Sequence, residues 1–444
     1  MRKPQTSRRL AFVAASLMVV LLAGCGGSNG EDEDALAYNP NPPPQCGVVG
    51  NCPPSGFDII GPEPKPLCAD ALDYGTVFTG GSGAGELVKM KFDTTRKIYE
   101  LQILESPVPR NVGDIFPTRA GVTFTGTYAN LTNLPTAEQN RCALELRTAQ
   151  ASDDSSQAVI DPAQPPIIYL GHGVAGGGIP GATIAYGGIL GIGAIPETTF
   201  NMYPVLAFSE IETDFNSVGG TYNYLGFHMV PSGGSIFKVN PFAIATGSGT
   251  EVLHADGTCS RADGQACLTT GSAWVARGDG AFESANDARR NRYPSFFGSA
   301  VTPQNFLSRA RGIMVVGKLR GARVPVVVRV GYARISRVSI DDESGMAILA
   351  PNTPLVAGQL NGGYVGSGSD FKYTVSVVKD STVTLLDPQT QKNTGRYTID
   401  WNQSTPSVAT TVGQDGAIGQ LIASGPVFAH LADNTFRASV FAAP

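Results

Sequence analysis

The feature that most restricts the fold of this chain is an alternation of apolar and polar residues with a period of two. Residues 88–92 read Val-Lys-Met-Lys-Phe and residues 99–103 read Tyr-Glu-Leu-Gln-Ile, with a polar turn segment at residues 93–97. A period of two places successive side chains on opposite faces of a strand, so that one face is buried and the other meets water. These two segments therefore predict a β-hairpin.

Short segments of the same kind recur along the chain at near-regular spacing. The 54 glycines, 31 prolines and 16% charged residues are typical of a globular protein with many turns. Helical patterns are scarce, and residues 284–292 and 302–310 are the best short candidates. Many short strands with such turns favour an all-β fold of antiparallel sandwich or barrel lobes. The further strands are expected at residues 122–128, 143–147, 203–211, 221–230, 235–245, 272–277, 312–320, 324–332, 370–378, 381–386, 396–401, 419–422 and 435–441.

Residues 171–193 stand apart because ten of these 23 residues are glycine. Apolar residues lie between the glycines, which fits either thin strands packed closely together or a mobile loop. We place the boundary between two β lobes just after this segment. The expected lobes are an N-terminal lobe at residues 67–200 and a barrel-like C-terminal lobe at residues 201–444.

The N-terminus has the three parts of an export signal. Four basic residues and no acid precede an uninterrupted apolar or small segment at residues 10–23. As a helix, these residues rise about 21 Å, which is too short for a bilayer core of about 30 Å. The pattern predicts a signal peptide at residues 1–24 that is removed from the mature protein.

Residues 22–25, Leu-Ala-Gly-Cys, resemble the lipobox of bacterial lipoproteins. The resemblance implies acyl chains on Cys25, and hence a membrane as a partner. In lipoproteins kept at the inner membrane, the resemblance places an aspartate at the position of Gly26. We therefore expect this protein at the outer membrane, at its periplasmic face or at the cell surface. Residues 25–66 contain an acidic run and three consecutive prolines, and they predict a disordered tether.

Six cysteines remain once Cys25 is set aside. An even number in an exported chain indicates disulfides, and six cysteines allow 15 pairings. Short spacing favours the two local pairs and leaves one long-range pair. The expected pairs are Cys46 with Cys52, Cys259 with Cys267, and Cys68 with Cys142.

Charge is distributed unevenly along the chain. Removal of the four basic residues of the leader shifts the formal net charge from −5 to −9, and this acidity argues against a nucleic-acid partner. Residues 277–337 hold eleven arginines and one lysine against three acids, a local balance of +9. These residues form either a solvated β surface with paired arginines or a patch that binds anions. The possible anion-binding patch comprises Arg309, Arg311, Lys318, Arg320, Arg323 and Arg329.

The motifs that carry chemistry are weak. Residues 171–176 match the spacing of a dinucleotide-binding loop, but the glycines and proline that follow prevent the helix that the pyrophosphate needs. Cys259 and Cys267 are spaced more widely than the paired thiolates of a zinc site. We therefore expect no cofactor, no metal and no catalytic residues. A hydrolase triad would need one of the four histidines, which are His172, His228, His254 and His430.

Two resemblances to known families add to these observations. Residues 214–222 resemble the first strand of lipocalins, with Tyr222 at the position of the lipocalin tryptophan, and this fits an up-and-down barrel. The whole chain is similar to a family of bacterial outer-membrane lipoproteins known only as a domain of unknown function. That similarity depends on the box at residues 22–25, the proline-rich tether and the glycine-rich β body, and it implies no activity or site residues.

The sequence thus predicts a lipid-anchored cell-envelope protein that binds a ligand or an envelope partner without catalysis. A barrel mouth is one place for such a ligand. The first alternative is a structural or assembly role at the outer membrane, and the second is an envelope hydrolase. A deep cavity with convergent polar groups would favour the binding role.

Overall fold

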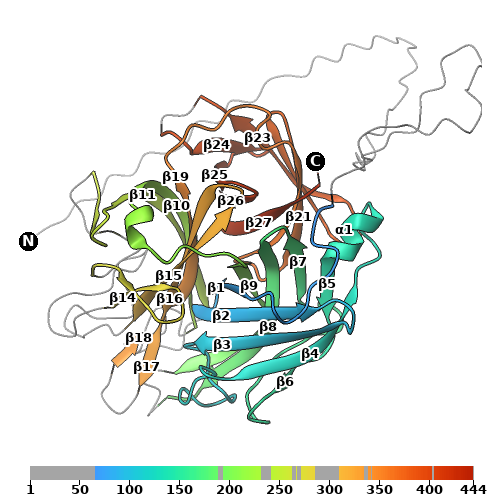
Figure 1. Ribbon diagram of the computed structural model, residues 1–444, viewed down its shortest axis with the longest axis vertical. Coiled ribbons are helices and arrows are strands. Elements are labelled where there is room, and N and C mark those ends of the chain that lie inside the picture. Colours follow the sequence, from blue (N-terminus) through green and yellow to red (C-terminus); the bar gives the residue numbers. More distant parts are fainter. Residues whose placement is uncertain are drawn as a thin grey trace, which may run out of the picture. The chain divides into compact units, whose positions relative to one another are not determined.

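The computed structural model describes most of the chain after residue 65 (Figure 1). Several expected features lie outside the described part: the leader, Cys25, the tether, Cys46, Cys52, Arg309 and all but the last residue of the helix expected at residues 302–310. The described residues are 66–188, 194–231, 242–262, 267, 272–285, 310–334, 339–341, 343–402 and 405–443.

The described part is almost entirely antiparallel β structure, which confirms the predicted fold class. Its helical elements are one turn and a half of α-helix, α1 (Ala137–Cys142), and a 3-10 turn, η1 (Phe215–Ser217). Thr136 and Gln139 form a capping box at the start of α1, which satisfies backbone donors that the helix leaves open. In this part of the chain, no helix has both the length and the apolar character needed to cross a bilayer.

The first module is a closed ring of eight strands, which we call the N-terminal barrel. Its order is β3-β2-β1-β9-β8-β7-β5-β4, and pairing of β3 with β4 closes the ring. The short strand β6 (Gln150–Ala151) adds to β4 at its edge. The ring strands are β1 (Phe78–Ser82), β2 (Glu86–Asp93), β3 (Ile98–Glu105), β4 (Thr123–Asn130), β5 (Ala143–Leu146), β7 (Ile167–Gly171), β8 (Val174–Tyr186) and β9 (Ile195–Phe208).

The predicted hairpin at residues 88–103 forms β2 and β3, and its dry face fills this barrel. Val88 pairs with Ile103 and Met90 with Leu101, and all four side chains are buried in one core. The lysines between them are partly exposed on the outer face. In this hairpin, therefore, the apolar residues of the alternating pattern lie inside the ring and the polar residues lie on its outer face.

The second module is an open eight-stranded sheet with the order β12-β11-β10-β19-β16-β15-β14-β13. Gly220 to Tyr222, the lipocalin-like residues, begin β10 after η1 in this open sheet. A separate pair, β17 (Tyr332–Arg334) and β18 (Ser339–Asp341), follows β16. The sheet strands are β10 (Gly220–Val230), β11 (Ala243–Leu253), β12 (Cys259–Ser260), β13 (Val275–Ala276), β14 (Phe282–Ala285), β15 (Arg311–Leu319), β16 (Ala322–Val330) and β19 (Ser344–Pro351).

The third module is an up-and-down ring in which each strand pairs with the next and the last pairs with the first. We call it the C-terminal barrel, and it is drawn in orange to red in Figure 1. Its strands are β20 (Gly362–Gly368), β21 (Tyr373–Lys379), β22 (Thr382–Leu386), β23 (Asn393–Asp400), β24 (Ala409–Gly413), β25 (Ile418–Ser424), β26 (Val427–Ala432) and β27 (Thr435–Ala443).

Glycines permit the modules to pack closely against one another. A Cβ built on Gly176 of β8 would lie 2.5 Å from Val440 of β27, and one built on Gly81 of β1 would lie 2.3 Å from Val328 of β16. Real Cβ atoms do not approach that closely, so a larger residue would separate the sheets. The glycine-rich segment at residues 171–188 therefore forms thin, closely packed strands, and residues 189–193 lie outside the described part.

Two sequence expectations need correction. The helix expected at residues 284–292 begins instead as strand β14, because Ser284 and its neighbours pair along the edge of β15, and tertiary pairing overrides a short helical pattern. The strand expected at residues 235–245 is described only from residue 242, and β11 extends beyond it to Leu253. The rest of both segments lies outside the described residues.

Candidate functional site

The two disulfides that the structure describes are the pairs expected from the sequence. Cys68 bonds Cys142 and Cys259 bonds Cys267, with Cα–Cα distances of 5.9 Å and 6.2 Å. The pairing of Cys46 with Cys52 stays a prediction.

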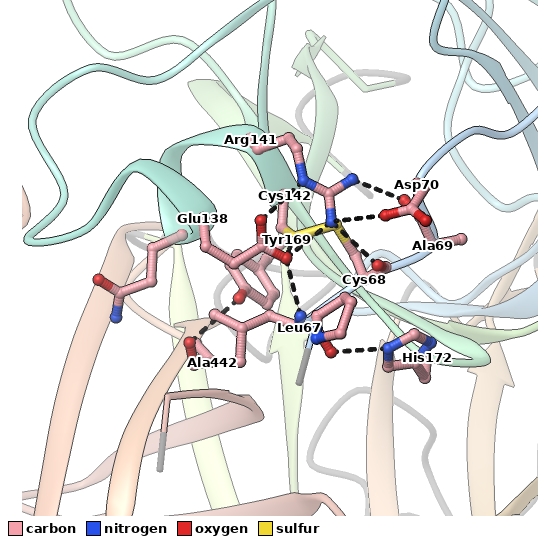
Figure 2. The surroundings of a disulfide bond; sticks show 12 residues. Leu67, Cys68, Ala69, Asp70, Glu138, Arg141, Cys142, Tyr169, His172 and Ala442 are labelled. Atoms are coloured by element: carbon pink, nitrogen blue, oxygen red, sulfur yellow. Dashed lines mark hydrogen bonds and ion pairs between the residues drawn. A yellow bond between two sulfur atoms is a disulfide. The ribbon is translucent and has the colours of Figure 1, made fainter. Parts of the chain in front are cut away.

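The Cys68–Cys142 bond lies where the described chain begins (Figure 2). Glu138 of α1 accepts a hydrogen bond from the Leu67 amide at 2.8 Å, and Arg141 donates to the carbonyls of Cys68 and Ala69. His172 Nε2 lies 2.8 Å from the Pro66 carbonyl. These contacts and the disulfide attach residues 66–69 to the N-terminal barrel.

The possible anion-binding patch does not form one surface. Lys318, Arg320 and Arg323 lie at the turn end of the β15–β16 hairpin, where Lys318 pairs with Arg323 across the strands. Arg311 and Arg329 lie at the opposite end. Arg311 is within ion-pair distance of Glu105 and Glu283, in a half-buried network that also holds Arg277. Arg309 lies outside the described residues.

Arg329 lies on the face of β16 opposite Val326, Val328 and Val330, which the alternation alone assigns to water. Its side chain is only 2% exposed, and its Nη1 donates to the carbonyl of Glu343. Residues 324–330 are all buried, so both faces of β16 are covered here.

The four histidines occupy four different environments. His254 Nε2 lies 2.9 Å from the Ser260 hydroxyl at the surface, and His228 Nδ1 lies 2.7 Å from a carboxylate oxygen of Glu343 in a buried position. His430 is fully buried inside the C-terminal barrel. In that barrel His430 lies with several other buried polar groups that have no hydrogen-bond partner among the described residues.

The interior of the C-terminal barrel has an apolar end and a polar end. At the apolar end, Tyr364 packs edge-on against Phe428 and Phe441, with ring centroids 4.6 Å and 5.6 Å apart. The Tyr364 hydroxyl donates to the Leu360 carbonyl just before β20, which fastens this end. Because strand directions alternate in an up-and-down ring, the turns after β20, β22, β24 and β26 lie at the other end.

Arg437 and His430 dominate the polar end. They are direct cross-strand partners on β27 and β26, so both side chains are on the inner face. Nε and Nη1 of Arg437 and Nδ1 of His430 are buried without a hydrogen-bond partner among the described residues. The hydroxyls of Ser439, two residues along β27, and Ser376 on β21 are likewise buried without one.

The remaining contacts of His430 fix its ring. Its Nε2 lies 2.9 Å from the Thr411 hydroxyl, and the ring of Tyr397 stands edge-on at 4.9 Å. Burial, helped by the charge on Arg437, lowers the pKa of His430 to about 3. The imidazole is therefore neutral at physiological pH, and when Nε2 accepts from Thr411, Nδ1 carries the proton and faces the interior as a donor.

The turns at this end of the barrel carry exposed charges of both signs, with Lys372 and Lys392 beside the aspartates. Asp370, Asp415 and Asp433 are exposed on three different turns. The Tyr397 hydroxyl donates to Asp433, and burial together with this carboxylate raises the pKa of Tyr397 to about 12. Among the described residues, Arg437 forms no ion pair with these or any other carboxylates.

The N-terminal barrel also encloses an arginine, but this one is fully paired. Nε and Nη2 of Arg119 lie 2.7 Å and 2.8 Å from the two carboxylate oxygens of Glu86. Ser106 and Ser82 donate to the same carboxylate. Burial acts to lower the pKa of Arg119, and the charge and hydrogen bonds of Glu86 more than offset this effect and raise it.

Sequence reasoning missed Arg437 and Ser439, although residues 435–441 were expected as a strand. Phe436, Ala438 and Val440 alternate with them, which is the usual pattern of a core face opposite a wet face. In the structure these apolar residues face outward against the other modules, in a core shared with the open sheet. The alternation was visible in the sequence, but the identity of the inner face was not.

These features define the chain as an all-β protein with two closed antiparallel barrels and an open sheet, in which the C-terminal barrel encloses a charged, polar interior. The chain belongs to a family described as protein of unknown function (DUF2957), whose model matches residues 98–442. That match covers most of all three modules. Among the curated proteins, none matches the chain.

Proposed function

We propose that this protein is a lipid-anchored component of the bacterial cell envelope that binds a small ligand in its C-terminal barrel without chemical conversion. The binding role depends on one observation, the group of buried polar atoms at one end of the barrel interior. Nε and Nη1 of Arg437 and Nδ1 of His430 belong to this group. Buried polar groups without partners are costly, and a ligand that satisfies them recovers that cost as binding energy.

The anchor part of the proposal is supported by the residues around Cys25 and by the attachment at Cys68. A signal-like leader and a box ending in cysteine precede about forty residues of tether. Glu138 and Arg141 hold the first described residues against the N-terminal barrel. In this arrangement, acyl chains on Cys25 keep the protein at the outer membrane, and the tether allows the barrels to stand clear of the headgroups.

One experiment tests both parts in the native host. Cells are labelled with an alkyne analogue of palmitate, and the full chain is purified from the envelope of wild-type, Cys25→Ser and Arg437→Gln strains. We expect label on the wild type and not on Cys25→Ser, and a small-molecule envelope extract should raise the melting temperature of the wild type but not that of Arg437→Gln. An unlabelled wild type would refute the anchor, and equal shifts in the wild type and Arg437→Gln would refute the binding site.

A structural role is the second candidate, favoured by the N-terminal barrel. Its interior is filled by apolar side chains and by the satisfied pair of Glu86 and Arg119. A filled barrel with a cross-linked attachment point suits a rigid spacer rather than a receptor. The binding proposal therefore concerns the C-terminal barrel alone.

A further inference from the structure

The buried donors at the polar end of the C-terminal barrel share a chemical preference. Arg437 offers two N–H groups and Ser439 offers a hydroxyl on the same strand. His430 offers Nδ1–H in the tautomer in which its Nε2 accepts from Thr411. A carboxylate is the small group that accepts several hydrogen bonds at once and also neutralises a guanidinium. The interior thus matches the carboxylate end of a ligand.

The residues of β20 that lie opposite two of these donors are glycines. Gly366 lies opposite Ser439 and Gly368 lies opposite Arg437 on β20, so neither position adds a side chain to the interior. A Cβ built on Gly368 would lie 3.2 Å from Cγ of Arg437, so the aliphatic part of the arginine rests on this glycine. The packing of this aliphatic part against Gly368, and not an ion pair with an acidic residue, therefore orients the guanidinium.

The charges around the same end are of both signs. Asp370, Asp415 and Asp433 are on turns at the polar end, and Asp415, Asp433 and Arg437 all act on the pKa of Tyr397. Lys372 and Lys392 are exposed on turns at the same end. A ligand with one carboxylate and one ammonium group would meet Arg437 with the first and the aspartates with the second.

The geometry points to a small zwitterion as the ligand: an α-amino acid or a compound with the same carboxylate and ammonium groups, bound with its carboxylate on Arg437, His430 and Ser439 and its ammonium toward Asp433. This inference rests on the proposed binding role of the barrel. Asp433 is the most favourable ammonium partner because its carboxylate is already held in place by the Tyr397 hydroxyl.

The test uses the full mature chain and four defined probes: glycine, acetate, methylamine and inorganic phosphate. Binding is measured by calorimetry and by the carboxyl carbon resonance of labelled glycine and acetate. Glycine should bind at least tenfold more tightly than acetate, and methylamine and phosphate should not bind detectably. Arg437→Gln should abolish binding of glycine and acetate alike, while Asp433→Asn should weaken glycine binding at least threefold and leave acetate binding unchanged.

The matched control is Arg396→Gln, which removes an exposed arginine from the outer face of β23 in the same barrel. Glycine binding that survives in this variant and disappears in Arg437→Gln supports the inference. Tighter binding of phosphate than of glycine, or equal loss in both arginine variants, overturns the zwitterion assignment. If none of the four probes binds while the envelope extract still stabilises the wild type, the assignment of a zwitterion as the ligand is wrong and the binding role stands. If the extract also has no effect, both proposals fail.

Discussion

Arg119 in the N-terminal barrel and Arg437 in the C-terminal barrel both lie inside a closed ring of eight strands, but their surroundings differ. Arg119 is held by both oxygens of Glu86 and lies 5.4 Å from the centroid of the Tyr203 ring. Arg437 has buried N–H groups without a partner among the described residues. An enclosed charge that is already satisfied serves the fold, whereas one that is not satisfied is available to a ligand. The difference supports the proposed division of a structural role for the first barrel and a binding role for the second.

The largest expected effect is on stability, from the loss of the Cys68–Cys142 disulfide of the N-terminal barrel. The C-terminal barrel contains no cysteine and offers no such bond. Replacing Cys68 and Cys142 together by alanine should lower the free energy of unfolding by about 4.5 kcal/mol, because the bond closes a long loop. Removal of the local Cys259–Cys267 bond should lower it by roughly 2.5 kcal/mol. Urea denaturation of the two double variants measures both values, and an equal loss in each would contradict the loop-length argument.

The ion pair inside the N-terminal barrel comes next. Glu86→Gln should lower the free energy of unfolding by about 4 kcal/mol, because it leaves the buried charge of Arg119 uncompensated. The partly exposed pair of Lys91 on β2 and Glu100 on β3 is the control, and Glu100→Gln should cost less than about 1 kcal/mol. If Glu86→Gln were as mild as Glu100→Gln in urea denaturation, the structural role of the buried pair would be lost.

A smaller effect is a pH dependence of the unfolding free energy, which comes from His430 in the C-terminal barrel. His430 has a pKa of about 3 in the folded protein, below its ordinary value near 6.5, so the unfolded chain takes up a proton that the folded barrel rejects. Its contribution is therefore fully present above pH 6.5 and declines as the pH falls, by about 2 kcal/mol between pH 7 and pH 5. The difference in unfolding free energy between wild type and His430→Gln, measured at both pH values, isolates this residue. A difference that does not change with pH would show that His430 is not enclosed.

The smallest effect is expected at the rim. Asp433 adopts a positive φ of 51°, a conformation that asparagine tolerates well, and the asparagine carbonyl still accepts from Tyr397. Asp433→Asn should therefore cost less than about 1 kcal/mol of unfolding free energy. Thermal denaturation checks this value, and a larger loss would mean that the aspartate acts in folding rather than on the ligand.

The sequence predicts much of this fold because alternation is a local property. Residues 88–103 show their pairing, and the long-range disulfide follows once the two short-spaced cysteine pairs are set aside. What alternation does not reveal is which face of a strand lies inside a closed ring. The apolar residues of 435–441 face other modules, and the polar residues face the barrel interior.

The same limit explains why the arginine-rich segment was misleading. Eleven arginines in residues 277–337 suggest a charged surface, but Arg311 and Arg329 have partners outside that segment. Arg311 meets Glu105 of β3, and Arg329 meets the backbone of Glu343, just before β19. The local charge count does not include such partners, because strand pairing and the packing of one sheet on another bring them together.

The most direct test of the account compares the two enclosed arginines in the same assay. The free energy of unfolding is measured for Arg119→Gln and Arg437→Gln in the full mature chain without added ligand. We expect Arg119→Gln to lose about 3–5 kcal/mol, as for a broken buried pair, and Arg437→Gln to change by less than about 1 kcal/mol or to gain stability. A loss in Arg437→Gln as large as that in Arg119→Gln would show that Arg437 is a structural residue, and the distinction between the two barrels would fail.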